Sequence, residues 1–368
     1  MINWNSLWSI VVLSSIVCAD PFWVVRHGTL VESRLDPIIA PGVVSGHTHA
    51  IVGTGSFDPN YSYENSRNSD CTTANVDVDF SSYWVPALYA QWPNGTFTKQ
   101  KFRGANTYYQ VRRGTNEPIY EFPPGFRMVA GDPYRTTFDA SVLAQDAVRY
   151  NCLGVTGPET NKFPAQYCPD GLRAEVYFPH CWDGVNNWLD GSAHVSYGAE
   201  GTFDGGGRCP DTHPKRIMGL FYEFLFDDVK PETGAKRTLA TGDQTGYGFH
   251  GDFTNGWPTG LFSKIWAEGE TCNVGFSLEN CPPLKEVMTD ISDCKYDGLI
   301  VDEEIGYTPL DALPGNNPVF DAENPRQPDL NYVEKAQFVR AVNGMPGPGP
   351  ETPPPAMVSP TQVDSGDR

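Results

Sequence analysis

Eight cysteines remain in this chain once an apolar N-terminal segment is set aside, and they constrain its fold more than any other feature. The apolar run from Leu7 to Val17 ends in Val17-Cys18-Ala19, which is the pattern of a secretory signal with small residues before its cleavage site. Residues 1–19 are therefore predicted to be a signal peptide. The remaining cysteines are even in number: Cys71, Cys152, Cys168, Cys181, Cys209, Cys272, Cys281 and Cys294.

These cysteines predict four disulfides, because an exported chain folds in an oxidising compartment. Their spacing does not determine the pairing, since eight cysteines can pair in roughly a hundred ways. A zinc cluster is the competing interpretation, but the sequence has no Cys-x-x-Cys pair and its spacings are irregular. Covalent cross-links suit a chain with 37 glycines, 32 prolines and only 19% charged residues, a composition typical of short strands joined by long loops.

The sequence also limits location and partners. Asn60-Tyr61-Ser62 and Asn94-Gly95-Thr96 are N-glycosylation sequons, which fits a secretory route. The formal net charge of -19 opposes binding to nucleic acid or to an anionic membrane. Beyond the signal, no stretch is long and apolar enough to cross a bilayer. We therefore expect a secreted, extracellular, monomeric glycoprotein with neither nucleic acid nor a membrane as its partner.

Alternating apolar and polar residues predict strands in several places. The segments 76–80, 173–178 and 220–226 have this pattern, and the last two are rich in aromatic residues. The segment 83–89 also resembles a strand, although Pro86 would place it at a sheet edge or at a bulge.

Helical patterns are few and short, at residues 140–148 and 333–342. We therefore predict a mainly β fold over residues 20–335, a single large, disulfide-stapled, β-sandwich-like domain with long loops. Residues 336–368 are rich in proline and glycine and are predicted to be a disordered tail.

Histidine is scarce in this sequence, and most of it lies in turn-rich polar segments. His47 and His49 are two residues apart, so both would face the same side of a strand. Two imidazoles on one face make half of a metal site, which His194, His213 or His250 would complete with a divalent ion. The alternative is that one of the pair is a buried hydrogen-bonding group and the other a surface residue. No cofactor is certain from this pattern.

Carboxylates offer a second chemistry, since glycoside hydrolysis usually needs two Asp or Glu residues. Glu175 and Glu223 interrupt aromatic-rich strands, where an apolar environment would raise the pKa and favour a general acid. Asp183 and Asp252 are expected in turns. The structural alternative is an ion pair, for Glu175 with Arg173 or Arg127, and a turn cap for the aspartates.

A third chemistry is β-elimination beside a uronic acid. A tyrosine or histidine would abstract the proton, and Arg127, Arg173 or Arg34 would bind the sugar carboxylate. Aromatic rings near the same turns are candidates for stacking on sugars, although most such rings pack in cores. These rings belong to Trp84, Trp182, Tyr247 and Trp257, with Tyr89 and Phe249 beside them.

Several motifs in order resemble one family, the mostly fungal secreted "domain of unknown function 1996". The resemblance covers about residues 22 to 295 and departs from the family pattern at His180. The motifs are Arg34-Leu35-Asp36-Pro37, Gly46-His47-Thr48-His49-Ala50, Tyr83-Trp84-Val85-Pro86-Ala87-Leu88-Tyr89, Gly125-Phe126-Arg127-Met128-Val129-Ala130-Gly131, Cys168-Pro169-Asp170-Gly171-Leu172-Arg173, Cys181-Trp182-Asp183-Gly184-Val185-Asn186, His194-Val195, His213-Pro214 and Gly246-Tyr247-Gly248-Phe249-His250-Gly251-Asp252-Phe253.

The resemblance implies a secreted fungal protein of a kind often joined to cell-wall or carbohydrate-binding modules, and it implies no mechanism. Together with the residues above, it leads us to expect a carbohydrate-active enzyme that acts on a cell-wall or plant polysaccharide, or on an oligosaccharide, by hydrolysis or elimination. The chief alternative is a non-catalytic, glycan-binding or wall-associated protein. A metal-dependent enzyme is the third.

Overall fold

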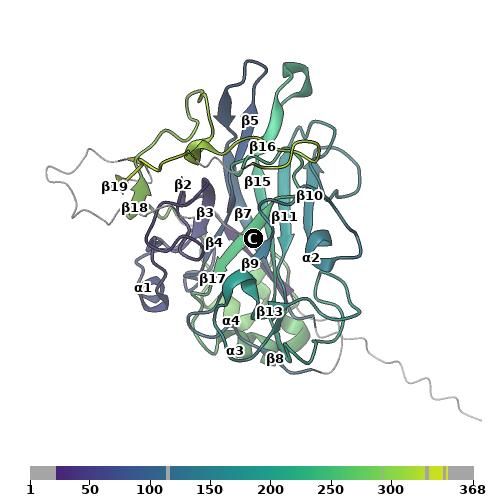
Figure 1. Ribbon diagram of the computed structural model, residues 1–368. Coiled ribbons are helices and arrows are strands. Elements are labelled where there is room, and N and C mark those ends of the chain that lie inside the picture. The colour runs from purple at the N-terminus through teal and green to yellow at the C-terminus, as the bar shows by residue number, and fades with distance from the viewer. Residues whose placement is uncertain (1–21, 113–116, 292, 328–330, 343–344, 347–368) are drawn as a thin grey trace, which may run out of the picture.

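The computed structural model describes residues 22–112, 117–291, 293–327, 331–342 and 345–346. The predicted signal peptide and most of the predicted tail lie outside these residues. The fold is mainly β, as expected, and Figure 1 shows its strands gathered around the centre of the molecule. Within the described residues, no helix is long and apolar enough to cross a membrane.

Two five-stranded antiparallel sheets form the body of the fold. The first sheet has the order β1 (Phe22–His27), β7 (Phe102–Gln110), β15 (Gly219–Phe226), β11 (Gly171–Tyr177) and β10 (Val148–Leu153). The second sheet has the order β2 (Val31–Ser33), β3 (His49–Gly53), β4 (Ser82–Pro86), β17 (His250–Thr254) and β9 (Arg127–Gly131).

Three small sheets and short helices surround these two. One small sheet has the order β16 (Lys236–Leu239), β5 (Leu88–Gln91) and β6 (Phe97–Lys99). Another has the order β13 (Val195–Ser196), β12 (Cys181–Trp182), β14 (Lys215–Ile217) and β8 (Ile119–Tyr120). The third has the order β18 (Leu299–Val301), β19 (Phe338–Val342) and β20 (Met345–Pro346). The α-helices are α1 (Tyr63–Arg67), α2 (Leu143–Asp146), α3 (Leu261–Ala267) and α4 (Pro282–Lys285). Single 3-10 turns occur at Asp190–Ser192, Pro231–Thr233, Gly269–Cys272, Leu278–Asn280 and Pro314–Asn316.

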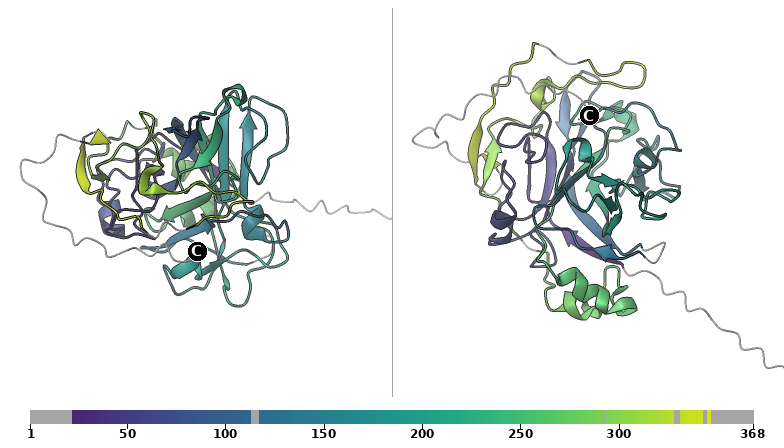
Figure 2. Two further views of the ribbon diagram at one scale, coloured as in Figure 1. Left: turned by 45° about the horizontal axis from the view of Figure 1, so that its top comes forward. Right: turned by 60° about the horizontal axis from the view of Figure 1, so that its bottom comes forward.

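The main hydrophobic core lies between the two large sheets and contains the inward-facing side chains of both. The sheets approach closely at Gly251, where an added Cβ would lie 2.6 Å from the Val176 side chain, so only glycine fits there. A second core lies on the opposite face of the second sheet, where Trp84 and Ile51 pack near Ile300 and Phe338 of the C-terminal strands. Figure 2 shows this C-terminal layer beside the sheet. The second sheet is therefore buried on both faces.

Four disulfides connect all eight cysteines, which confirms that prediction. The pairs are Cys71–Cys294, Cys152–Cys168, Cys181–Cys209 and Cys272–Cys281. The first joins cysteines 223 residues apart and ties the segment between β3 and β4 of the second sheet to the C-terminal layer. In the chain-entropy account the longest loop gives the largest stabilisation, on the order of 5 kcal/mol.

Several local expectations need correction. Residues 333–342 do not form a helix, because Phe338–Val342 pair as β19 with β18, and this tertiary pairing outweighs a weak helical pattern. The fold therefore extends past the predicted tail boundary at residue 336. The expected strand 76–80 is reduced to one bridge at Val76. Pro86 ends a central strand, not an edge strand, at the point where the chain leaves the second sheet.

Candidate functional site

Three histidines meet on the face of the second sheet that carries the C-terminal layer. His49 is paired with Pro86 of β4, and Asp252 of β17 is paired with Trp84 of the same strand. Because β4 and β17 are antiparallel, two residues back along β17 from Asp252 corresponds to two residues forward along β4 from Trp84, so His250 lies level with Pro86. His49 and His250 therefore flank Pro86 on opposite sides of β4. Residues two apart on a strand face the same side, so His250 shares the face of Asp252. His47 precedes β3 and joins His49 and His250. Strand pairing, and not sequence proximity, therefore assembles the cluster.

The three rings contact one another. The Nε2 atoms of His47 and His250 lie 3.1 Å apart. The ring centroids of His47 and His49 are separated by 4.3 Å. One ligand nitrogen from each histidine can be chosen so that all three lie within 4.8 Å of one another, and no other His, Cys, Asp or Glu group in the described residues converges in this way.

Backbone carbonyls fix the tautomers of two of these rings. His250 Nδ1 donates to the carbonyl of Gly248 at 3.0 Å, and His49 Nδ1 donates to the carbonyl of Leu35 at 2.9 Å. The Nε2 atom of each ring therefore carries a lone pair, because a neutral imidazole has one N–H only. His250 Nε2 accepts from His47, whereas His49 Nε2 is buried and has no hydrogen-bond partner among the described residues. Such an orphan acceptor in an interior is costly.

Burial keeps the cluster neutral. His47, His49 and His250 are 8%, 0% and 4% exposed. Desolvation, followed by the neighbouring histidines, lowers the pKa of His47 and His49 well below the usual range, and desolvation lowers the pKa of His250 to about 4. At neutral pH the three rings are therefore uncharged, which is the state in which imidazole binds a metal.

This donor set fits a transition-metal ion. Nitrogens bound at about 2.0–2.1 Å to one tetrahedral ion must lie about 3.3 Å from each other. His47 and His250 already have nearly this separation, and the third nitrogen needs a shift on the order of 1 Å. The carbonyls of Gly248 and Leu35 accept hydrogen bonds from Nδ1 of His250 and His49, and these bonds leave Nε2 of both rings free to bind an ion.

A C-terminal segment covers the cluster. Asn317 Nδ2 donates to the carbonyl of Gly46, the residue before His47, at 2.7 Å. Arg34 donates to the carbonyl of Ser45 and forms ion pairs with Glu303, at 2.6 Å and 2.8 Å, and with Glu334. Sequence reasoning missed both acidic partners, since 269 and 300 residues separate them from Arg34 and no local pattern marks them.

The other two candidate histidines lie elsewhere. His194 Nε2 donates to the carbonyl of Arg127 at 2.9 Å. His213 Nε2 is 3.0 Å from the carbonyl of Ala193, so it belongs to the same peripheral region as His194. Neither one completes the His47–His49 pair, so His250 is the one of the three candidates that joins it.

The predicted glutamates meet on the outer face of the first sheet. Glu175 and Glu223 are directly opposite each other on β11 and β15. Arg173 bridges them, with Nε 2.5 Å from Glu175 and Nη1 3.1 Å from Glu223. Desolvation, opposed by Arg173, raises the pKa of Glu175 to about 8. Asn106 donates to Glu223 at 2.9 Å.

The two aspartates differ from each other. Asp183 caps its own turn, accepting from the amides of Val185 and Asn186, as the structural alternative predicted. Asp252 lies in the middle of β17 and not in a turn, and it is buried on the histidine-bearing face.

The aromatic candidates are mostly unavailable to a ligand. Trp84 and Trp257 are 0% and 3% exposed and pack in the two cores, which leaves no ring face for a sugar. Trp182 is half-buried and donates to the carbonyl of Asn186. Tyr247 stacks on Phe138.

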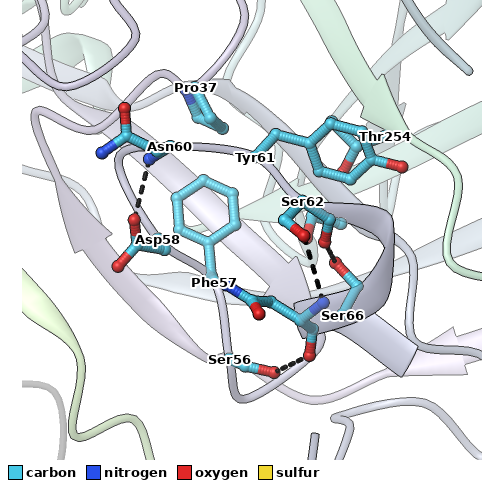
Figure 3. Close-up of a pocket in the computed structure, with 11 residues that line it drawn as sticks. Pro37, Ser56, Phe57, Asp58, Asn60, Tyr61, Ser62, Ser66 and Thr254 are labelled. Carbon is cyan, nitrogen blue, oxygen red and sulfur yellow. Dashed lines mark hydrogen bonds between the residues drawn. The ribbon is translucent and has the colours of Figure 1, made fainter. Parts of the chain in front are cut away.

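A groove of about 330 Å³ lies elsewhere, lined by Tyr61, Tyr63, Arg127 and their neighbours. A smaller pocket of about 10 Å³ beside α1 holds no more than a water-sized group (Figure 3). It is formed by Phe57, Asp58, Tyr61 and Thr254 among others, and none of the candidate catalytic residues lines it.

Comparison with known proteins gives one match. The family described as "Domain of unknown function (DUF1996)" matches residues 36–257, which include His47, His49 and His250. Neither a curated protein nor a solved structure matches the chain. The matched segment spans more than half of the sequence, and the chain therefore belongs to the DUF1996 family.

Proposed function

We propose that the protein is an exported, metal-dependent enzyme that acts on an extracellular polysaccharide or oligosaccharide, with one divalent transition-metal ion held by His47, His49 and His250. The observation that carries the metal is the buried Nε2 of His49, which no described residue hydrogen-bonds, beside the His47–His250 contact. A bound ion would satisfy this lone pair and remove its desolvation cost.

The chemistry follows from the donor set. Three neutral imidazoles leave a fourth position for water or for a substrate oxygen, as in catalytic and not in closed structural sites. An ion there would act as a Lewis acid and would lower the pKa of a bound water molecule. Either hydrolysis or elimination on a sugar can use such a centre.

The groove supports an extended glycan as substrate. Arg127 begins β9 and is paired with Thr254, whereas His250 begins β17 at the opposite end of the same strand pair. Four residues of strand separate them, or about 13 Å. The groove offers two tyrosine rings and a guanidinium, which suit sugar faces and hydroxyl or carboxylate groups. A glycan in the groove would therefore lie on the same strand pair as the cluster, while the C-terminal segment covers the histidines themselves.

A second candidate function is metal-independent glycoside hydrolysis by Glu175 and Glu223. It is favoured by their unequal environments: the pKa of Glu175 is raised to about 8, while Glu223 accepts from Arg173 and Asn106. A pair of carboxyl groups in unequal environments, one of them with a raised pKa, is the arrangement that glycosidases use.

Export is part of the proposal. Residues 1–19 would be removed as a signal peptide, and Asn60 and Asn94 would carry glycans. Four disulfides are typical of proteins from oxidising compartments. A fungal source is implied only by the resemblance of the motifs.

The test is an activity panel with controlled metal content. Purified protein is stripped with a chelator, reloaded with one divalent cation, and incubated with fungal and plant glycans. New reducing ends report hydrolysis, and an ultraviolet-absorbing product reports elimination. We expect product from the reloaded protein and from a His213→Ala control, and none after chelation or in His49→Ala.

Other outcomes separate the alternatives. Product that survives chelation but is lost in Glu175→Gln would support the second candidate and contradict the first. Retention of a glycan without any product would contradict both enzymes and support a binding protein.

A further inference from the structure

The hairpin between β5 and β6 places an aromatic ring beside one of the two sequons. The register pairs Gln91 with Phe97, and the Trp92 amide donates to the carbonyl of Thr96 at 2.8 Å. The amide of Gly95 donates to the carbonyl of Trp92 at 2.9 Å, and Gly95 has a φ of 88°, a left-handed conformation that suits glycine. The tip of this hairpin is therefore a tight, three-residue turn that carries Asn94. Strand β5 is labelled in the upper part of Figure 1.

The side chains of the turn share one face. Trp92 lies across from Thr96, and its indole Nε1 donates to the hydroxyl of Thr98 at 2.8 Å. Because Thr96 and Thr98 are two residues apart, both face the side on which the indole lies. The Thr96 hydroxyl donates to Asn94 Oδ1 at 2.8 Å, which holds the Asn94 carboxamide on that side as well.

The remaining atoms are available to a sugar. Asn94 is exposed, and its Nδ2, to which an N-glycan is attached, has no hydrogen-bond partner in the described part of the chain. Trp92 is half-buried, and no other aromatic ring of the described residues packs against it. An indole next to the attachment point presents an apolar surface to the first sugar ring.

We propose that Asn94 carries an N-linked glycan whose first N-acetylglucosamine packs on the Trp92 indole and stabilises the β5–β6 hairpin. This inference rests on the proposed export, but it does not depend on the metal centre. The fixed turn and the ordered carboxamide mean that little conformational freedom is left to lose when the sugar packs.

The second sequon serves as the internal comparison. The Ser62 hydroxyl caps α1 by accepting from the amide of Asn65 and donates to Glu64, so it is not bonded to Asn60. The residue two positions before Asn60 is Asp58, not an aromatic residue. Two rings line the same pocket as Asn60, but Phe57 is buried and the Tyr61 hydroxyl donates to the carbonyl of Asn255, so neither takes the place that Trp92 has beside Asn94.

A double-mutant cycle tests the packing. The protein is secreted from a eukaryotic host and trimmed to one N-acetylglucosamine per site, and its unfolding is compared with that of Thr96→Ala, which removes the sequon. The same comparison is made in the Trp92→Leu background, and Asn60→Gln is the matched control. Mass spectrometry of the peptide containing Asn94 reports occupancy.

When Trp92 is present, we expect the sugar at Asn94 to lower the unfolding equilibrium constant about two- to tenfold, which is the size of effect that an aromatic pair gives. This change is counted after subtracting the effect of Thr96→Ala measured in unglycosylated protein. The effect should vanish in Trp92→Leu and be absent for Asn60→Gln. An equal effect with and without Trp92 would overturn the inference, and so would secreted, processed protein with Asn94 unmodified. Failure of the proposed export would be distinguishable from failure of this inference, because the protein would then keep residues 1–19.

Discussion

His47 and His250 are 203 residues apart in sequence, yet their Nε2 atoms lie 3.1 Å from each other. The contact exists because β3 and β17 both pair with β4, which brings the two histidine segments to one end of the second sheet. His49 completes the group with a lone pair that no donor satisfies within the part of the chain that the structure describes. The geometry of this cluster leads to the first prediction.

A bound ion should stabilise the folded protein. Zinc at a concentration a hundred times its Kd should raise the free energy of unfolding by about 2.7 kcal/mol, because the unfolded chain does not hold the three rings together. Denaturant unfolding of chelated and reloaded protein measures the difference. The stabilisation should be retained in His213→Ala and lost in His49→Ala, and equal stabilisation in both variants would count against the site.

Arg34 should be essential for the layer that covers the histidines. It is 1% exposed and is held by Glu303 and Glu334, so Arg34→Met would leave two partly buried carboxylates without their buried counter-ion. Breaking a buried pair in this way costs about 3–5 kcal/mol. Arg103→Met is the control, because its ion pair with Asp227 is largely exposed and contributes under about 1 kcal/mol. Urea unfolding compares the two, and equal losses would contradict the assigned role.

The buried histidines should make the fold sensitive to acid. Desolvation lowers the pKa of His27 from 6.5 to about 3 in the folded protein. The unfolded chain therefore binds a proton that the folded chain does not, so stability is full above pH 6.5 and falls as the pH drops toward 3. In His27→Gln the free energy of unfolding should fall less over this window than in His213→Gln. Parallel pH profiles for the two variants would show that His27 does not contribute.

Glu175 should have the opposite effect on the pH dependence of stability, with a contribution that is lost as the pH rises. Its pKa is raised by burial to about 8, so the folded protein keeps a proton that the unfolded chain loses near pH 4.5. This contribution is fully present below pH 4.5 and is lost as the pH rises through 8. Glu175→Gln should therefore flatten the decline in stability over that range. An unchanged profile, measured by denaturant unfolding at each pH, would refute the raised pKa.

The sequence predicted the chemistry of the site better than its assembly. The spacing of His47 and His49 indicated that they share a face, and His250 was one of three residues that could complete a metal site. Only the pairing of β4 with both β3 and β17 selects His250 over His194 and His213. The alternation around Glu175 and Glu223 predicted strands correctly, but their direct opposition depends on the register of β11 and β15.

Other features had no local signal. The partners of Arg34 lie 269 and 300 residues away, and the residues that contain Glu334 and β19 were expected to be a helix leading into a tail. The disulfide count followed from composition, whereas the pairing required the fold. Long-range contacts of this kind decide which candidates become one site.

Metal stoichiometry tests the central claim most directly. The secreted protein is dialysed against a trace of zinc and, separately, of copper, and metal per chain is measured by plasma mass spectrometry for wild type, His49→Ala, His250→Ala and the His213→Ala control. We predict one ion per chain in wild type and in the control, and a large loss in the other two variants. Wild-type protein without a stoichiometric ion, or ions retained equally in all four proteins, would contradict a metal centre at His47, His49 and His250.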